Sequence, residues 1–412
     1  MALACVLTSA GAGITGAFFL WALEEVTGWH RAQGWLLGAL PALGVAGAWL
    51  YRVANPAAAH GTALLVEGSS APGRPVPFVM APLILVTTLL THLGGGSAGR
   101  EGTALQLGGG IAAGVMRWLR LPPGAAGWLL PAGMASGFAA VFGTPWAAGL
   151  FAWEVTRGRG MAMEAARPGV AAACMACAWA GHGVAMACGA EHVGLDGGLA
   201  RGLPSWGGLG ASAACGLAMG MVARVFVRGV GWARASFGRL PSWWMAPALG
   251  GLCVGGAAWA TGERGYLGLG MVPMDAGDPS IAGCFRGETV EWWAWASKLG
   301  FTVVTLGSGF RGGEVTPLFF VGATAGHALG TALGTSPALV AAAGMTSLFA
   351  SASRAPWACA VMGWELFGWG ALPCVVVACA AGFGSGPCAG LYPVAPGKGQ
   401  AGCGEGDEGA GS

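Results

Sequence analysis

Long runs without formal charge are the feature of this 412-residue sequence that most limits its fold. Four such runs cover residues 121–153, 203–223, 315–353 and 366–397, and hydrophobic residues make up 55% of the chain. A helix needs about 20 mostly apolar residues to cross the hydrocarbon core of a bilayer, where charged side chains are costly. The runs therefore predict an all-α polytopic membrane protein.

Charge and cysteine usage exclude several other classes of protein. Charged residues make up 9% of the chain, whereas a soluble domain carries roughly a quarter. The net charge of +2 says nothing about nucleic acid, and no basic patch of interleaved aromatic residues suggests it, so we expect no nucleic-acid partner. Cys174 and Cys177 have no second cysteine pair at metal-ligand spacing, so we interpret them as packing residues and expect no metal and no cofactor.

The two ends of the chain differ in character. The first 51 residues predict two apolar segments separated by a polar connector at residues 24–33. The N-terminus lacks the basic region of a secretory signal, so we interpret it as the first membrane helix. Residues 393–412 are polar and glycine-rich, which predicts a disordered tail after a transmembrane domain at residues 1–392.

A glycine loop at residues 94–99 precedes the adjacent charged residues Arg100 and Glu101, and residues 75–99 carry no charge. A helix that begins after such a loop presents unpaired backbone N–H groups at the positive end of its dipole, which favours an anion. A glutamate at the same helix start can occupy this site when ionised and leave it when protonated. The pattern therefore predicts that Glu101 couples anion binding to proton binding.

Two segments of the chain match at an offset of 211 residues, which indicates an internal duplication. Residues 137–155 match residues 348–366 through the pairs Phe138/Phe349, Pro145/Pro356, Trp146/Trp357, Trp153/Trp364 and Glu154/Glu365. The same offset places Gly96, Ser97, Arg100 and Gly102 opposite Gly307, Ser308, Arg311 and Gly313. In transport proteins such repeats commonly meet near the bilayer midplane, where broken helices face an ion.

The duplication predicts a second helix start beside the first, in the sequence GGEVTP. Pro317 suits the first turn of a helix, because its missing N–H would be unpaired there in any case. Glu314, Val315 and Thr316 would then offer backbone N–H groups and one hydroxyl to the same ion.

Both helix starts resemble signatures of the CLC anion channels and proton-coupled exchangers. The first stands as Gly99-Arg100-Glu101-Gly102, the second runs from Gly313 to Pro317, and the match spans about residues 10–392. The sequences of both motifs, together with FLWALEEVT near the N-terminus, resemble those of the CLC-F branch, the bacterial fluoride/proton antiporters. The resemblance implies a CLC-type fold with two inverted repeats, at about residues 10–190 and 205–392, in a homodimer that crosses the bacterial inner membrane several times.

The resemblance also implies roles for individual residues. Glu101 would be the gating glutamate and proton carrier. The ion would be bound by Thr62, Arg100, Gly102, Glu314, Val315, Thr316 and Tyr392. Thr62 stands where chloride-selective members have serine and the fluoride branch often has methionine or asparagine, which leaves the choice of anion open. Val155 occupies the position of the intracellular proton-transfer glutamate of chloride/proton exchangers.

Three functions remain open at this point. The first is a secondary transporter that exports fluoride in exchange for protons, and the second is a chloride channel or chloride/proton exchanger of the same fold. The third is an intramembrane hydrolase that uses Ser97 or Ser308, although neither loop has a nearby base other than His92. We interpret Glu154 and Glu365 as structural, and His92 and His327 as packing histidines.

Overall fold

A computed structural model describes residues 1–70, 75–157, 168–195, 199 and 204–392, so the predicted tail at 393–412 lies outside the described residues. Within them the chain forms sixteen α-helices, two short 3₁₀ helices and no β-strand, which confirms the all-α prediction. The α-helices are α1 (Ala2–Ala32), α2 (Leu36–Ala54), α3 (Thr62–Ser70), α4 (Met80–Leu93), α5 (Glu101–Trp118), α6 (Ala126–Phe142), α7 (Pro145–Arg157), α8 (Pro168–Ala187), α9 (Trp206–Gly238), α10 (Met245–Thr261), α11 (Ile281–Arg286), α12 (Ala294–Gly307), α13 (Val315–Ala332), α14 (Pro337–Ser353), α15 (Pro356–Phe367) and α16 (Leu372–Ser385). The 3₁₀ helices are η1 (Pro56–His60) and η2 (Pro123–Ala125).

An uncharged run in the sequence does not correspond to a single membrane helix. The run at 315–353 contains both α13 and α14, and the run at 121–153 contains both α6 and α7. In the described part of the chain, five helical stretches are long and apolar enough to cross a bilayer, while α4, α10, α14 and α16 are shorter. The connector expected at residues 24–33 was wrong, because α1 continues to Ala32.

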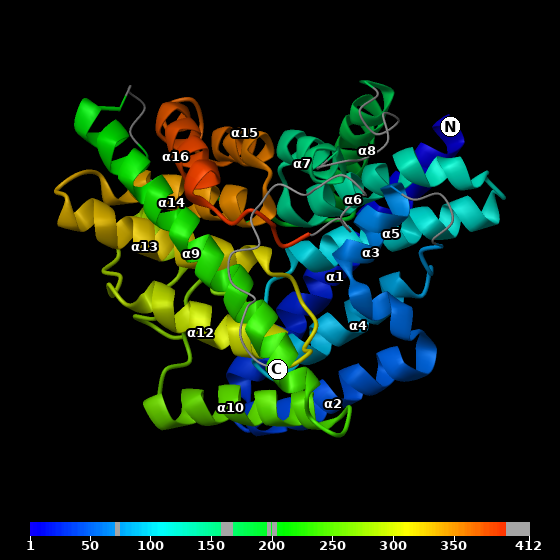
Figure 1. The fold of residues 1–412 in the computed structure, drawn as a ribbon, viewed down its shortest axis with the longest axis horizontal. Coiled ribbons are helices and arrows are strands. Elements are labelled where there is room, and N and C mark those ends of the chain that lie inside the picture. Colours follow the sequence, from blue (N-terminus) through cyan, green and yellow to red (C-terminus); the bar gives the residue numbers. More distant parts are fainter. Residues whose placement is uncertain (71–74, 158–167, 196–198, 200–203, 393–412) are drawn as a thin grey trace, which may run out of the picture.

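The sixteen α-helices divide into two similar sets of eight, α1–α8 and α9–α16 (Figure 1). Corresponding helices have equal lengths in three cases, with 14 residues in α4 and α12, 18 in α5 and α13, and 17 in α6 and α14. They also have corresponding neighbours, since α1 packs on α8 as α9 packs on α16, and α5 packs on α6 as α13 packs on α14. We propose on this basis that residues 10–190 and 205–392 are the two repeats of one transmembrane domain.

The spacing between the repeats changes along the chain. Helices α6 and α14, and likewise α7 and α15, begin 211 residues apart, but α4 and α12, and α5 and α13, begin 214 apart. The connector between α5 and α6 is three residues longer than the one between α13 and α14, which accounts for the difference. The pairing of Arg100 with Arg311 at an offset of 211 was therefore wrong, and Gly99 corresponds to Gly313.

Gly99 and Gly313 lie against each other and show how the repeats are related. The N–H of Gly99 donates to Gly313 O at 2.6 Å, and the N–H of Gly313 donates to Gly99 O at 2.7 Å. Each glycine thus donates one hydrogen bond to the other and accepts one from it. Such a reciprocal contact indicates an approximate two-fold axis between the repeats. This axis brings the beginnings of α5 and α13 together.

Two glutamates repeat this reciprocity at α7 and α15. Glu365 accepts hydrogen bonds from the backbone N–H groups of the second and third residues of α7, at 3.0 and 2.7 Å. Glu154 accepts from the second and third residues of α15, at 3.3 and 2.9 Å. Each carboxylate satisfies N–H groups that the helix leaves unpaired and lies at the positive end of its dipole. These contacts support a structural role for both glutamates.

We expect Glu365→Ala to lower the free energy of unfolding by about 1–2 kcal/mol, the usual cost of removing a helix cap. Glu154→Ala should have a similar effect, because its contacts are equivalent. The measurement is the melting temperature of the purified protein in detergent, with Glu25→Ala as a control on the exposed surface of α1. Equal melting temperatures for the cap variants and the control would contradict the structural role.

Candidate functional site

The glycine loop before α5 is fixed to α12 by a serine. The N–H of Ser97 donates to Thr305 Oγ1 at 3.3 Å, and Ser97 Oγ lies 3.0 Å from Thr302 Oγ1. In the other repeat, Ser308 Oγ donates to Val304 O at 2.8 Å. Both serine hydroxyls therefore have structural partners, and neither is bonded to a histidine that could act as a base. This geometry does not support the hydrolase.

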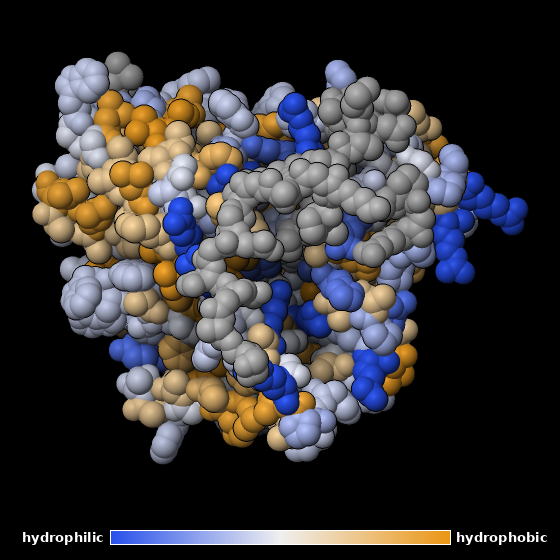
Figure 2. All heavy atoms as spheres, in the orientation of Figure 1, coloured by the Kyte–Doolittle hydropathy of each residue, from blue (hydrophilic) through white to orange (hydrophobic). Residues whose placement is uncertain are grey.

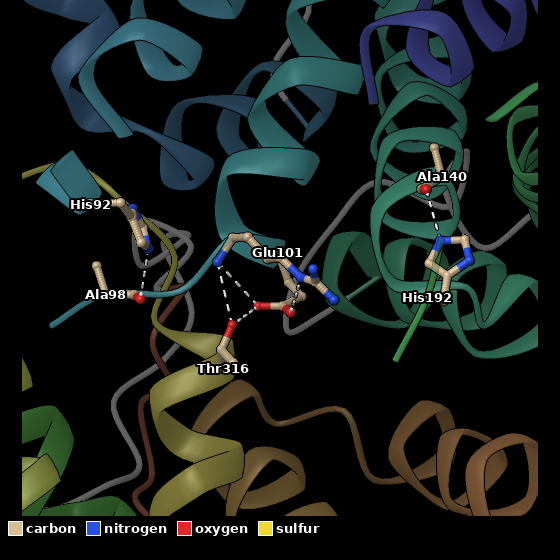
Figure 3. Close-up of polar contacts among 7 residues, drawn as sticks. His92, Ala98, Glu101, Ala140, His192 and Thr316 are labelled. Carbon is tan, nitrogen blue, oxygen red and sulfur yellow. Dashed lines mark hydrogen bonds and ion pairs between the residues drawn. The ribbon is translucent and has the colours of Figure 1, made fainter. Parts of the chain in front are cut away.

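Glu101 is the first residue of α5 and is fully buried. Thr316 Oγ1 donates a hydrogen bond to Glu101 Oε2 (Figure 3). The N–H of Arg100 lies 3.3 Å from Glu101 Oε2 and also 3.3 Å from Thr316 Oγ1. Arg100 Nε lies 3.5 Å from Glu101 Oε1 as an ion pair. The Glu101 carboxylate thus lies between the two helix starts.

Glycine is required where the two helix starts meet. A Cβ on Gly99 would lie 2.6 Å from Thr316 Oγ1 and 2.9 Å from Gly313 O, closer than real Cβ contacts. A Cβ on Gly102 would lie 2.8 Å from Gly313 Cα and 3.1 Å from Glu314 Oε2. The Glu314 carboxylate therefore lies beside the start of α5. Two acidic side chains share one region of positive helix dipole.

A cavity of about 530 Å³ leads to one side of this junction. Its polar lining includes Thr62, Gln106, Arg234, Arg311, Glu314 and Tyr392. Thr62 Oγ1 accepts a hydrogen bond from Gln106 Nε2 at 3.4 Å. The Tyr392 hydroxyl is buried and lies beside the Glu314 carboxylate. A buried hydroxyl at this place can donate to that carboxylate or to a bound anion.

A second cavity, of about 890 Å³, includes Arg100 in its lining. His192 also lines it, and its Nε2 lies 3.0 Å from Ala140 O (Figure 3). Burial lowers the pKa of the His192 imidazole below its ordinary value. The two cavities share no lining residue, and Glu101 lines neither of them. Arg100 faces one cavity and Glu314 the other, so the Glu101 carboxylate lies between them.

The structure brings the predicted site residues into two groups. Arg100, Glu101 and Thr316 form the junction, with the backbone of Gly102 and Val315 at the first turns of α5 and α13. The Val315 side chain itself is fully buried in the core. Thr62, Glu314 and Tyr392 line the smaller cavity.

Two basic residues near the site were not among the predicted site residues. Arg311 donates from Nη1 to Ala59 O at 2.8 Å, lies over the ring of Tyr51 at 4.5 Å and lines the smaller cavity. Lys298 is fully buried in α12. Its Nζ donates to the carbonyl oxygens of the three residues 266–268, at 3.0, 3.4 and 2.7 Å. The signal that could have identified Lys298 is an isolated ionisable residue in an apolar segment.

Known proteins resemble this chain over nearly its whole length. The sequence profile of the voltage gated chloride channel family matches residues 42–385. A "Chloride/fluoride channel protein" of Pseudomonas syringae pv. tomato is 36% identical over 373 residues, which cover 90% of this chain and 81% of that protein.

Solved structures give the same result. A CLC-type fluoride/proton antiporter is 30% identical with a TM-score of 0.86, and the match covers 95% of this chain and 96% of that one. A slow cyanobacterial Cl⁻/H⁺ antiporter is 19% identical with a TM-score of 0.77 over 93% of both chains, and shares the fold. The CLC-type fold predicted from the two helix starts is confirmed.

Proposed function

The chain belongs to the voltage gated chloride channel family, and on this premise we propose that it is a fluoride/proton antiporter that exports fluoride. Its fold is that of the CLC-type anion/proton antiporters. The observation that carries the proposal is the buried Glu101 carboxylate, bonded to Thr316 between two cavities. A carboxyl group that lies between two helix starts can link the movement of an anion to the movement of a proton.

The exchange cycle follows from competition for one position. The ionised Glu101 side chain is held by the Arg100 N–H, the Thr316 hydroxyl and the Arg100 guanidinium. Protonation removes its negative charge, which weakens all three contacts and releases the side chain. An anion then takes the same donors. Antiport results when Glu101 takes its proton from the side to which the anion leaves and releases it to the side from which the anion came, after which the ionised side chain returns.

The donors at this position suit a small anion. Fluoride holds its hydration shell strongly, so its release from water must be compensated by close hydrogen bonds and positive charge. Backbone N–H groups at two helix starts and the hydroxyls of Thr316 and Tyr392 are donors of this kind. Two relatives, a chloride/fluoride channel protein and a fluoride/proton antiporter, also favour fluoride.

A chloride channel or a chloride/proton exchanger is the alternative. Val155 stands in place of a proton-transfer glutamate and its side chain is buried, while the neighbouring Glu154 is bonded to α15. This position therefore offers no carboxylate for a second proton step. Glu314 does lie beside the start of α5, and a carboxylate there favours proton-coupled exchange over a passive channel.

We place the antiporter in the inner membrane of a bacterium, as a homodimer with one ion pathway in each subunit. Fluoride enters cells as the neutral acid and is trapped inside as the anion, so export driven by protons protects the cell. Large apolar side chains are exposed on the helices α7, α8, α15 and α16, among them Trp146, Trp179, Trp357, Val376 and Val377. Apolar side chains also gather on the face drawn in Figure 2, over α13 and α14 on its left side. Lipid or a second subunit would cover such surfaces.

Liposomes loaded with fluoride test the proposal directly. We expect fluoride efflux to drive protons into the liposomes, and fluoride flux to exceed chloride flux at least about tenfold, a preference of about 1.4 kcal/mol. A fluoride electrode and an internal pH dye measure the two movements. Equal fluxes of both anions without proton movement would show a passive channel, and proton movement driven by chloride would show a chloride/proton exchanger.

A further inference from the structure

Two residues on α4 contact the chain on both sides of Glu101. His92 Nε2 lies 3.1 Å from the carbonyl oxygen of Ala98, three residues before the glutamate (Figure 3). Thr88 Oγ1 lies 2.8 Å from Thr103 Oγ1, two residues after it. Residues four apart lie on the same face of a helix, so one side of α4 holds both contacts. All three polar side chains are almost fully buried.

His92 holds the loop through one of its two ring nitrogens. Its Nδ1 lies 2.8 Å from the carbonyl oxygen of Thr88, so both nitrogens face carbonyl oxygens. A neutral imidazole has a single N–H and can donate to only one of them. Only the form with the proton on Nε2 donates to Ala98 O and holds the loop before Glu101.

The loop needs this support because of its composition. Residues 94–99 read GGGSAG, and glycine loses more conformational freedom on folding than any other residue. Other contacts fix the backbone on either side of Ala98, where the Ser97 N–H donates to Thr305 Oγ1 at 3.3 Å and Gly99 exchanges two backbone hydrogen bonds with Gly313. His92 is the side chain that contacts the carbonyl oxygen of Ala98, between these two fixed residues.

We propose that His92 and Thr88 are positioning residues for Glu101, which keep its backbone fixed so that only its side chain moves during exchange. This inference rests on the proposed function of the same site. A backbone that shifts would let the carboxylate leave the Thr316 hydroxyl without taking up a proton. Anions would then pass without proton movement, so the expected defect is a loss of coupling rather than a loss of transport.

Two substitutions of His92 separate its two nitrogens. The amide NH₂ of glutamine reaches about as far as Nε2, so His92→Gln keeps a donor for Ala98 O. The NH₂ of asparagine reaches about as far as Nδ1, so His92→Asn keeps only the contact with Thr88 O. His327→Asn is the matched control, because His327 is also a buried histidine in an apolar helix but its Nδ1 has no hydrogen-bond partner within the described residues.

The readout is the number of anions moved per proton in liposomes, together with the pH profile of anion flux. Loss of the Ala98 bond should raise the anion-to-proton ratio about fivefold in His92→Asn, and His92→Gln and His327→Asn should keep the original ratio. Thr88→Val removes the second contact without changing the size of the side chain and should raise the ratio in the same direction. Protein yield and melting temperature show whether each variant is folded.

Wild-type ratios in both His92→Asn and Thr88→Val would overturn the inference, as would equal ratios in His92→Asn and His92→Gln. Failure of the proposed function looks different, because the original protein itself would then move anions without protons. In that case the pH profile of anion flux tests the positioning role of His92. A shifted midpoint in His92→Asn but not in His92→Gln would support the positioning role, and unchanged midpoints in both would refute it.

Discussion

Glu101→Gln is expected to abolish proton-coupled transport and to leave a folded protein. Glutamine has nearly the same size and can still accept a hydrogen bond from the Thr316 hydroxyl, but it carries no charge and cannot take up a proton. The ion pair with Arg100 is lost as well. Proton movement driven by a fluoride gradient should fall at least about 10²-fold, the usual effect of removing a positioned proton-transfer group. The measurement is proton uptake by liposomes during fluoride efflux.

Glu24→Gln is the matched control for this experiment. Glu24 lines the larger cavity, is exposed on α1 and makes no contact with the junction, so its substitution should leave the coupling intact. Vigorous fluoride-driven proton movement by Glu101→Gln would remove Glu101 from the mechanism. Fluoride flux that continues without protons would instead support the assignment of Glu101 as the proton carrier.

Lys298→Met is expected to lower the free energy of unfolding by about 1–3 kcal/mol, the cost of leaving buried carbonyl oxygens without their donor. The Lys298 ammonium is fully buried and donates to three consecutive carbonyl oxygens of the segment before α11. Methionine fills a similar volume but leaves those carbonyls without a donor. The same segment continues into Gly268 and Met271, which line the larger cavity, so its release also disturbs that cavity.

Thermal unfolding in detergent measures this loss, with Arg117→Met as a control at an exposed basic residue in the last turn of α5. Lys298→Arg should recover part of the stability, because a guanidinium also donates several hydrogen bonds to carbonyl oxygens. A melting temperature for Lys298→Met equal to that of the control would show that the three carbonyls do not depend on Lys298.

Local chemistry explains which parts of the site could be predicted from the sequence. A glycine loop followed by Arg100 and Glu101 in an uncharged segment has few stable arrangements in a membrane, so it predicted a helix start and an anion site. Pro317 predicted the second helix start in the same way. The contacts of His92 could not be predicted, because an isolated histidine in an apolar helix carries no sign of which carbonyl oxygens will face it.

Hydrophobicity, a local property, determined from the sequence alone that this chain is a helical membrane protein, and the resemblance of its two helix-start motifs to a known family implied the CLC fold. The tertiary structure decided which residues meet. Because one connector is three residues longer in the first repeat, the equivalent residues of the two repeats at the site are Gly99 and Gly313, and not Arg100 and Arg311. The tertiary structure also decided that Glu101 accepts a hydrogen bond from Thr316 and that Lys298 donates to backbone carbonyl oxygens. Such contacts join residues up to about two hundred positions apart, and the packing of whole helices, rather than any local preference, brings them together.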